Sequence, residues 1–446
     1  MNEIKNDIPI IKTFIHENKC YFYDTYSNQL LNVSKEQFIE IGELQKIGLN
    51  EYKNLNKDNK PYQDIIMMIN KGFLREQFIE KIEHPDTKYI AYLVDRCINQ
   101  LIIEVTSACN FKCRYCHQTG KSALIPKTMN EDMAYRSVDF LFEHSKDAHE
   151  VTITFYGGEP LLNFELIKST VLYSNRKFKT KPVSYNMTTN GSLINDKFID
   201  FLIDYNFSLL ISLDGDESTQ NRHRKYSHDG GSTFNVVWNN IMKIRDSHPS
   251  YFDSNVSFNS VILQDENPED VMNFFTSNGI SKSAVSIRNA DLNGIDYTHT
   301  LIPLNEYEKS NESFEDKFKY MLKCFNDKNK ILSEWHHNGP CVPVARRLFV
   351  NTEGNFFPCE KVESESSCLL GSLDSGIDVE KAIQILNIGR LTNQDCTKCW
   401  ALRLCSICVL QCIDEGTWSR DKKMITCKTQ KEDAMMFLKE YIKNKK

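Results

Sequence analysis

The sequence predicts an α/β protein with a partial (β/α)6 barrel of the TIM type between residues 95 and 310. Two observations predict the barrel: six short runs rich in β-branched residues recur along this stretch, and helical patterns separate them. Strands that alternate with helices form a parallel sheet with crossover helices. A third observation predicts further domains, because the chain has 446 residues and eight of its fifteen cysteines lie between residues 359 and 427.

Residues 1–83 are predicted to form a small winged-helix-like domain. KCYFYDTYSNQLLNV indicates two strands around a Ser-Asn turn. Ser34 begins a helix, with Gln37 in a capping-box position. KPYQDIIMMINKGFL predicts a second helix with Pro61 in its first turn and Gly72 at its C-cap, and GFLRE would be a closing strand. The pattern leaves two roles open for this domain, a structural cap or a module that binds a peptide.

The six predicted barrel strands are QLIIEVT, EVTITFY, VSYNMT, SLLISLDG, SNVSFNSVIL and SAVSIRN. Asn130 is predicted to cap the helix after the first strand. The polar segment KIEHPDTKY before the barrel is typical of a linker, and the acidic stretch 291–340 is predicted to be helical. In such barrels the chemistry takes place where strands end and loops begin.

Three cysteines follow the first predicted strand with the spacing C-x3-C-x2-C, namely Cys109, Cys113 and Cys116. Iron–sulfur clusters are held by Cys thiolates, and three thiolates leave one iron of a four-iron cluster without a protein ligand. An open coordination position is what a catalytic metal keeps for its substrate. A zinc site and free thiols are the alternatives, but this spacing directly after a barrel strand favours a cluster.

With the aromatic Tyr115 before its last cysteine, this loop resembles the signature of the radical S-adenosylmethionine (SAM) superfamily. The resemblance implies that the open iron binds the amino and carboxylate groups of SAM. One electron from the cluster then cleaves SAM to a 5'-deoxyadenosyl radical, which removes a hydrogen atom from the substrate. The other predicted strand ends resemble the SAM pocket of the same family at Gly157, Gly158 and Glu159 in YGGEP, Asn190 in TTNG, Ser212 and Asp214 in SLDG, and Arg224.

The resemblance also implies roles for these pocket residues. The two glycines allow a close backbone approach, and Glu159 is expected to pair with the ammonium group of SAM. Arg224 is expected to meet the SAM carboxylate. For the residues after YGGEP, ordinary loop capping is the alternative.

The C-terminal cysteines resemble the SPASM extension of radical SAM peptide maturases, within a domain predicted over residues 335–446. The resemblance implies two auxiliary [4Fe–4S] clusters, which need eight thiolates. The sequence offers eight: Cys341, Cys359, Cys396, Cys399, Cys405, Cys408, Cys412 and Cys427. A zinc ribbon is the alternative, since paired C-x2-C spacing is also zinc chemistry.

By the family's pattern, the outer cluster is expected at Cys396, Cys399, Cys405 and Cys427. The inner cluster is expected at Cys341 and Cys359, together with Cys408, Cys412 or both. The spacing departs from the family at these last two cysteines, which leaves the choice between them open. Glu360 follows Cys359 at the position of an acidic base in sulfatase maturases, so we expect a catalytic acid or base there; a solvated carboxylate is the alternative.

The resemblance implies an enzyme that installs thioether crosslinks in a ribosomally made Cys-rich precursor peptide. The N-terminal domain would bind the leader of the peptide as an added strand, and a flavodoxin or ferredoxin would donate electrons. A sulfatase maturase that makes formylglycine and an enzyme that makes carbon–carbon crosslinks are the alternatives, as is a non-enzymatic metal-binding adaptor. Sulfatase maturases typically begin near the three-cysteine loop, whereas over a hundred residues precede it here, and an adaptor needs no SAM pocket.

Composition excludes other classes of partner. The net charge of -6 provides no basic field for nucleic acid. No apolar run approaches the roughly 20 residues that span a bilayer, and the N-terminus lacks a signal-peptide pattern. We therefore expect a cytoplasmic protein, in which abundant cysteine indicates metal binding or catalysis more often than disulfides.

Overall fold

The computed structural model describes residues 7–76, 79–116, 125–263, 266–289, 334–335, 342–345, 347–363 and 365–444. The chain divides into two compact units. Residues 1–88, 317–341 and 384–446 form the first, which we call the terminal unit, and residues 89–316 and 342–383 form the second, the barrel unit. The predicted domain boundaries differ from this division and stay a prediction.

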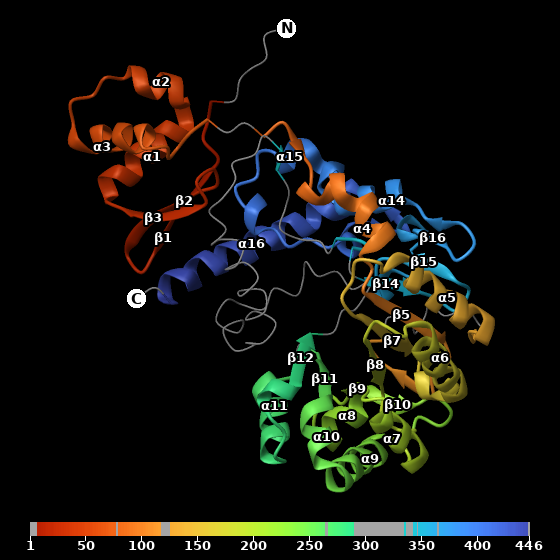
Figure 1. The fold of residues 1–446 in the computed structure, drawn as a ribbon. Helices are drawn as coiled ribbons and strands as arrows, with labels where there is room; N and C mark the ends of the chain where they lie inside the picture. The colour runs from red at the N-terminus through yellow and green to blue at the C-terminus, as the bar shows by residue number, and fades with distance from the viewer. Residues whose placement is uncertain are drawn as a thin grey trace. The chain divides into compact units, whose positions relative to one another are not determined.

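The N-terminal part of the terminal unit is an antiparallel sheet with three helices on one face (Figure 1). Its elements are β1 (Ile11–His16), β2 (Lys19–Asp24), β3 (Gln29–Val33), α1 (Lys35–Ile47), α2 (Leu49–Asn54) and α3 (Lys60–Asn70). Ser34 and Gln37 make the predicted capping box at the start of α1. Pro61 lies in the first turn of α3, and Gly72 follows its C-cap with a φ of 99°.

Two details of this domain differ from the sequence-based expectation. β1 was not predicted, and it pairs with β2 through a turn in which both Glu17 and Asn18 have positive φ angles. The predicted closing strand GFLRE is wrong, because Leu74 has a φ of 53° and its side chain is fully buried among the helices. A left-handed residue cannot continue a strand, and burial of an apolar side chain stabilises this bend.

The opposite face of the sheet packs against the C-terminal helix α16 (Arg420–Asn444). Phe14, Tyr21 and Tyr23 of the sheet form one core with residues that include Phe437 and Leu438 of the helix. The predicted linker is also anchored in this unit: β4 (Lys81–Ile82) pairs with β13 (Glu334–Trp335), and the Ile82 amide donates to Asn393 at 2.9 Å. Most of the helical stretch predicted over residues 291–340 lies outside the described residues.

The barrel unit contains the six predicted strands in parallel, and the sheet order is β12-β11-β9-β8-β7-β5 (Figure 1). The strands are β5 (Gln100–Thr106), β7 (Val151–Gly157), β8 (Val183–Thr189), β9 (Ser208–Ser212), β11 (Val256–Ile262) and β12 (Val285–Asn289). Six consecutive residues of β5 are buried, as expected for a parallel strand that is covered on both faces.

Helices connect these strands, and α4 precedes the first strand. Asn130 caps the first connecting helix, α5, because its side chain accepts a hydrogen bond from the Met133 amide at 2.8 Å, as predicted. The helices are α4 (Ile90–Arg96), α5 (Glu131–His144), α6 (Phe164–Lys177), α7 (Asp196–Asp204), α8 (Glu217–His223), α9 (Phe234–Ser247), α10 (Pro249–Asn255) and α11 (Pro268–Ser277). Where the structure describes the chain, none of its helices has the length and apolar character that crossing a membrane requires.

The sheet continues past β5 with strands from the C-terminal part of the sequence. β14 (Arg347–Val350) pairs parallel with β5, and β15 (Asn355–Phe357), β16 (Gly371–Ser372) and β17 (Gly376–Ile377) follow in antiparallel pairs. Residues 342–383 therefore complete one edge of the barrel sheet. The buried Glu104 carboxylate of β5 supports this edge, because it accepts the Thr352 amide at 3.0 Å.

Two glycines set the distance between the ends of β5 and β7. A Cβ atom on Gly157 would lie 2.1 Å from the Thr106 carbonyl oxygen, and one on Gly158 would lie 2.3 Å from the Ala108 carbonyl oxygen. Gly157 also has a φ of 139°, which L side chains rarely adopt. Only glycine allows the turn after β7 to contact residues 106–108.

We predict that Gly157→Ala destabilises the barrel unit by at least about 1–3 kcal/mol, because the backbone strain alone has that magnitude. Calorimetric unfolding measures the loss. Gly42→Ala is the control, since an added Cβ at this position of α1 meets nothing within 4 Å and should stabilise the helix by about 0.5–1 kcal/mol. Equal unfolding temperatures for the two variants would contradict the prediction.

Candidate radical SAM and iron–sulfur sites

The three-cysteine loop is fixed on both sides by backbone hydrogen bonds. Within it, β6 (Phe111–Cys113) pairs antiparallel with β10 (Arg224–Tyr226), so that Cys113 lies opposite Arg224. The Arg114 amide donates to the His223 carbonyl at 2.9 Å. All three cysteine residues are half-buried. The loop therefore holds three thiols at the carboxyl end of β5.

The environment of two of these thiols, Cys109 and Cys113, favours their protonated form. Burial raises the pKa of Cys109 to about 12 and that of Cys113 to about 11, although the guanidinium of Arg224 lowers the second value. Because thiolate is the ligating form, loading of the loop with metal must release protons.

Glu159, which is predicted to pair with the ammonium group of SAM, is fully buried. Its carboxylate accepts hydrogen bonds from the Thr189 hydroxyl at 2.7 Å, the Asn190 amide at 2.7 Å and the Leu161 amide at 3.1 Å. Burial nevertheless raises its pKa to about 7. The side chain thus ties the end of β7 to the end of β8 and titrates near neutral pH.

Asn190 connects this carboxylate to the three-cysteine loop. Its side-chain amide donates to Asn110 at 2.8 Å and lies 4.0 Å from the Cys109 sulfur. Ser212, at the end of β9, is buried and stands in register with Asn259 of β11. The structure therefore brings the predicted residues of YGGEP and TTNG together beside Cys109.

Asp214 and Arg224 form a buried ion pair, with 3.0 Å between the Arg224 Nε and Asp214 Oδ2 atoms. The Tyr115 hydroxyl donates to the same Asp214 oxygen, and the guanidinium lies 5.3 Å above the Tyr115 ring. One Arg224 nitrogen is also 3.9 Å from the Cys113 sulfur. The described contacts of Arg224 thus connect it to the cluster loop, and its role toward the SAM carboxylate stays a prediction.

Glu360 begins a short 3-10 turn, Glu360–Val362, directly after Cys359. Its carboxylate accepts a bond of 2.5 Å from Arg347 of β14. Sequence reasoning missed Tyr156 of β7: burial raises its pKa, and the charges of Glu360 and Cys116 add to the increase. Glu360 and the cluster loop therefore both lie within electrostatic reach of one tyrosine, whose only sequence signal is its place as the first residue of YGGEP.

The terminal unit gathers a second set of thiols. The charges of Cys396, Cys399 and Cys427 all act on Cys405 and add to the effect of burial, which raises its pKa. These four are the cysteines predicted to hold the outer cluster. Cys408 is exposed and Cys412 is buried. Of the other predicted ligands, Cys359 belongs to the barrel unit and Cys341 lies outside the described residues.

A buried lysine contacts one of these four thiols, and its need for a negative partner shows whether the site suits an iron–sulfur cluster. The Lys423 ammonium is 1% exposed and lies 3.3 Å from the Cys396 sulfur. A buried cation needs an anionic partner, and thiolates of a cluster provide one. Among the described residues, no three His, Cys, Asp or Glu side chains are placed to hold a single metal ion. A four-iron cluster does not require such a group, because each thiolate binds a different iron.

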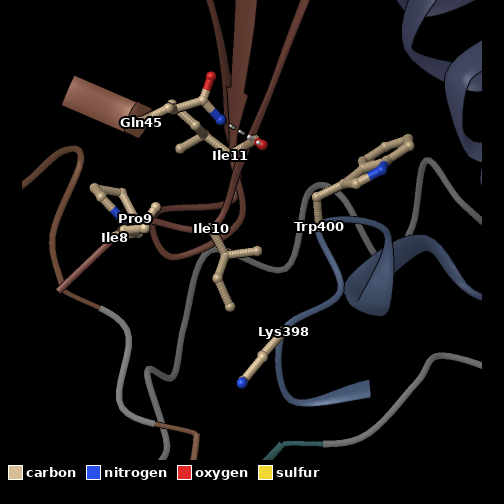
Figure 2. Close-up of a pocket in the computed structure, with 7 residues that line it drawn as sticks. All are labelled: Ile8, Pro9, Ile10, Ile11, Gln45, Lys398 and Trp400. Carbon is tan, nitrogen blue, oxygen red and sulfur yellow. Dashed lines mark hydrogen bonds between the residues drawn. The ribbon is translucent and has the colours of Figure 1, made fainter. Parts of the chain in front are cut away.

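A shallow pocket of about 250 Å³ lies beside β1 in the terminal unit (Figure 2). It is lined by Ile8, Pro9, Ile10, Ile11, Gln45, Lys398 and Trp400. Lys398 and Trp400 belong to the same loop as Cys399, so the pocket adjoins the second set of thiols along the sequence. Its lining combines apolar side chains with one ammonium and one indole.

Comparison with known proteins agrees with this geometry. Residues 103–277, which include the three-cysteine loop, YGGEP and SLDG, match the model of the radical SAM superfamily. The radical SAM cyclopropyl synthase TigE of Paramaledivibacter caminithermalis is 22% identical over 445 residues, covering 93% of this chain and 89% of its own. A cysteine-type anaerobic sulfatase-maturating enzyme of Clostridium perfringens is 22% identical over 375 residues, covering 75% and 95%.

The fold has solved counterparts as well. Native anSMEcpe, solved with AdoMet and a peptide bound, aligns with a TM-score of 0.56 at 19% identity, covering 77% of this chain and 99% of its own. At this identity the likeness concerns the fold alone. The protein is an enzyme with a radical SAM domain at residues 103–277, and its Cys-rich C-terminal region fits a SPASM domain.

Proposed function

We propose that the protein installs thioether crosslinks in a ribosomally made Cys-rich precursor peptide. The observation that carries the proposal is the presence of two separate thiol sets. Three thiols lie at the end of β5, and four lie in the terminal unit, where one of them contacts a buried ammonium. The first set leaves one iron of a four-iron cluster open for SAM. The second provides the ligands for an auxiliary cluster that accepts or relays an electron.

When bound, the first cluster and SAM supply a 5'-deoxyadenosyl radical that removes a hydrogen atom from the peptide. The residues of this chain hold the reactants. The β6–β10 pair positions the thiols, Glu159 offers a carboxylate to the SAM ammonium, and Glu360 is the candidate base for the peptide thiol. Bond formation between the peptide thiolate and the carbon radical would release one electron, and Cys396, Cys399, Cys405 and Cys427 would hold a cluster able to accept it.

The peptide itself is supported from two directions. One solved protein of this fold holds a peptide. Within this chain, the described sheet order β1-β2-β3 leaves one edge of β1 and one edge of β3 without a strand partner, which suits a leader peptide that adds a strand. The pocket beside β1 offers apolar contacts for one side chain of such a leader (Figure 2).

A second candidate function is the formation of carbon–carbon bonds in a peptide. It is favoured by the likeness to a cyclopropyl synthase over 93% of the chain. The same radical machinery serves both reactions, so the products rather than the site distinguish them.

The products of the reconstituted enzyme test the proposal. With SAM, a reductant and a Cys-rich precursor peptide, we expect the peptide to lose the mass of two hydrogen atoms per crosslink and one alkylatable thiol at the same time. Cys109→Ala should give no product, because the first cluster then lacks a ligand. Crosslinked product whose thiols all remain alkylatable would support carbon–carbon chemistry, and loss of sulfur would indicate formylglycine.

Iron content tests the two thiol sets. After anaerobic reconstitution we expect about twelve irons per chain. The number should fall to about eight in a Cys109→Ala/Cys113→Ala/Cys116→Ala variant, because only the cluster bound by these three cysteines is lost. Metal analysis of both proteins gives the counts. About four irons falling to none, with zinc in the terminal unit, would contradict the auxiliary clusters.

Binding of SAM should depend on pH through Glu159. Only the carboxylate form pairs with the ammonium, and its pKa is raised to about 7. We therefore expect the affinity for SAM to increase about tenfold per pH unit below that value and to level off above it. In the protein without SAM, the raised pKa of Glu159 makes the folded state less stable as pH rises from 4.5 to about 7. Over this range the unfolded chain releases a proton that the folded protein retains.

Titration calorimetry with SAM at several pH values measures this dependence. Glu159→Gln should bind SAM weakly with no rise toward neutral pH. Glu165→Gln is the matched control, because that exposed glutamate of α6 pairs with Lys197 instead. A Glu159→Gln protein that keeps the wild-type pH profile would show that another group controls the affinity.

A further inference from the structure

Lys423 occupies an unusual position for a lysine. It lies in the first turn of α16, and its side chain is directed into the protein with 1% exposure. Its ammonium donates to the Cys396 sulfur at 3.3 Å and to the Thr392 hydroxyl. The same hydroxyl lies 3.2 Å from the Cys396 sulfur. Two polar groups, an ammonium and a hydroxyl, thus converge on one predicted cluster ligand.

The partners of this ammonium are thiols and a hydroxyl instead of a carboxylate. In the described part of the chain, none of the ion pairs between side chains includes Lys423, whereas Cys396, Cys427 and Cys412 all act on it electrostatically. An ammonium that is buried without an anion is costly by several kcal/mol. The negative charge of cysteine thiolates would remove this cost.

Two lysines of α16 lie near Cys427, one about a helical turn before it and one about a turn after it. Lys423, Cys427 and Lys431 are spaced four residues apart and so share one helix face. Both lysines act electrostatically on Cys427, but Lys431 is exposed while Lys423 is buried. The interaction of an exposed charge is screened by water and salt, whereas that of a buried charge is not.

We propose that Lys423 sets the reduction potential of the iron–sulfur cluster held by Cys396, Cys399, Cys405 and Cys427. This inference rests on the proposed function, which places an auxiliary cluster there. A reduced cluster carries one more negative charge than an oxidised one, so a fixed neighbouring cation stabilises the reduced form more. Hydrogen bonds to cluster sulfurs act in the same direction. Lys423 provides both, and it would make the cluster a better acceptor for the electron that crosslinking releases.

Redox titration followed by electron paramagnetic resonance tests the proposal. It uses the full chain with Cys109, Cys113 and Cys116 replaced by Ala, so that only auxiliary clusters contribute. In Lys423→Met, the ratio of reduced to oxidised cluster at a fixed potential should fall about tenfold, which equals a shift of about 59 mV for a one-electron couple. Lys431→Met, the exposed counterpart, should shift the potential much less, and Lys423→Arg should stay near the parent value.

The iron content of each variant separates the outcomes. Absence of iron from the parent variant would refute the auxiliary cluster and with it the proposed function. Full iron content with equal potentials in Lys423→Met and Lys431→Met would overturn the inference about Lys423 alone.

Loss of iron from both Lys423→Met and Lys423→Arg would show a purely structural side chain and also overturn it. If Lys423→Met alone loses iron, Thr392→Val is measured in its place, because it removes the hydroxyl that holds the ammonium. A smaller decrease of the reduction potential is then expected in Thr392→Val, and an unchanged potential would refute the inference.

Discussion

The close backbone contact between the end of β7 and the start of the three-cysteine loop is the constraint on which the rest of the site depends. The Gly158 amide donates to the Thr106 carbonyl and the Glu159 amide donates to the Ala108 carbonyl, each at 2.9 Å. This contact brings the carboxylate of Glu159 into the space beside Cys109. Because parallel strands end on the same edge of a sheet, β8 and β9 then add their own terminal residues to one pocket.

Charged groups are buried at both thiol sets, and each has a specific partner. In the barrel unit, Arg224 pairs with Asp214 and also approaches Cys113. In the terminal unit, Lys423 has sulfur and hydroxyl partners. Buried charges are seldom retained for stability, since apolar residues of similar volume often stabilise a protein as well. Arg224 and Lys423 each lie beside a predicted cluster ligand, where their charges would act on a bound cluster.

The candidate site residues are distributed over the two units differently from their order in the sequence. The residues from 342 to 383, far from the barrel strands in sequence, extend the barrel sheet through β14 and place Glu360 near Tyr156. In the terminal unit, α16 buries the aromatic face of the N-terminal sheet. Segments that are far apart in the sequence therefore share one core.

The sequence by itself determined the six parallel strands, the capping box of α1, the N-cap of α5 and the three-cysteine loop. Each of these depends on residues that are adjacent or evenly spaced in the chain. It missed β1, since a Glu-Asn turn with two positive φ angles carries a weak signal, and it wrongly extended GFLRE as a strand. Only the tertiary structure decided the partners of Glu159, Arg224 and Lys423. Those partners come from distant strands and helices, and neither burial nor the resulting charge environment can be inferred from local spacing.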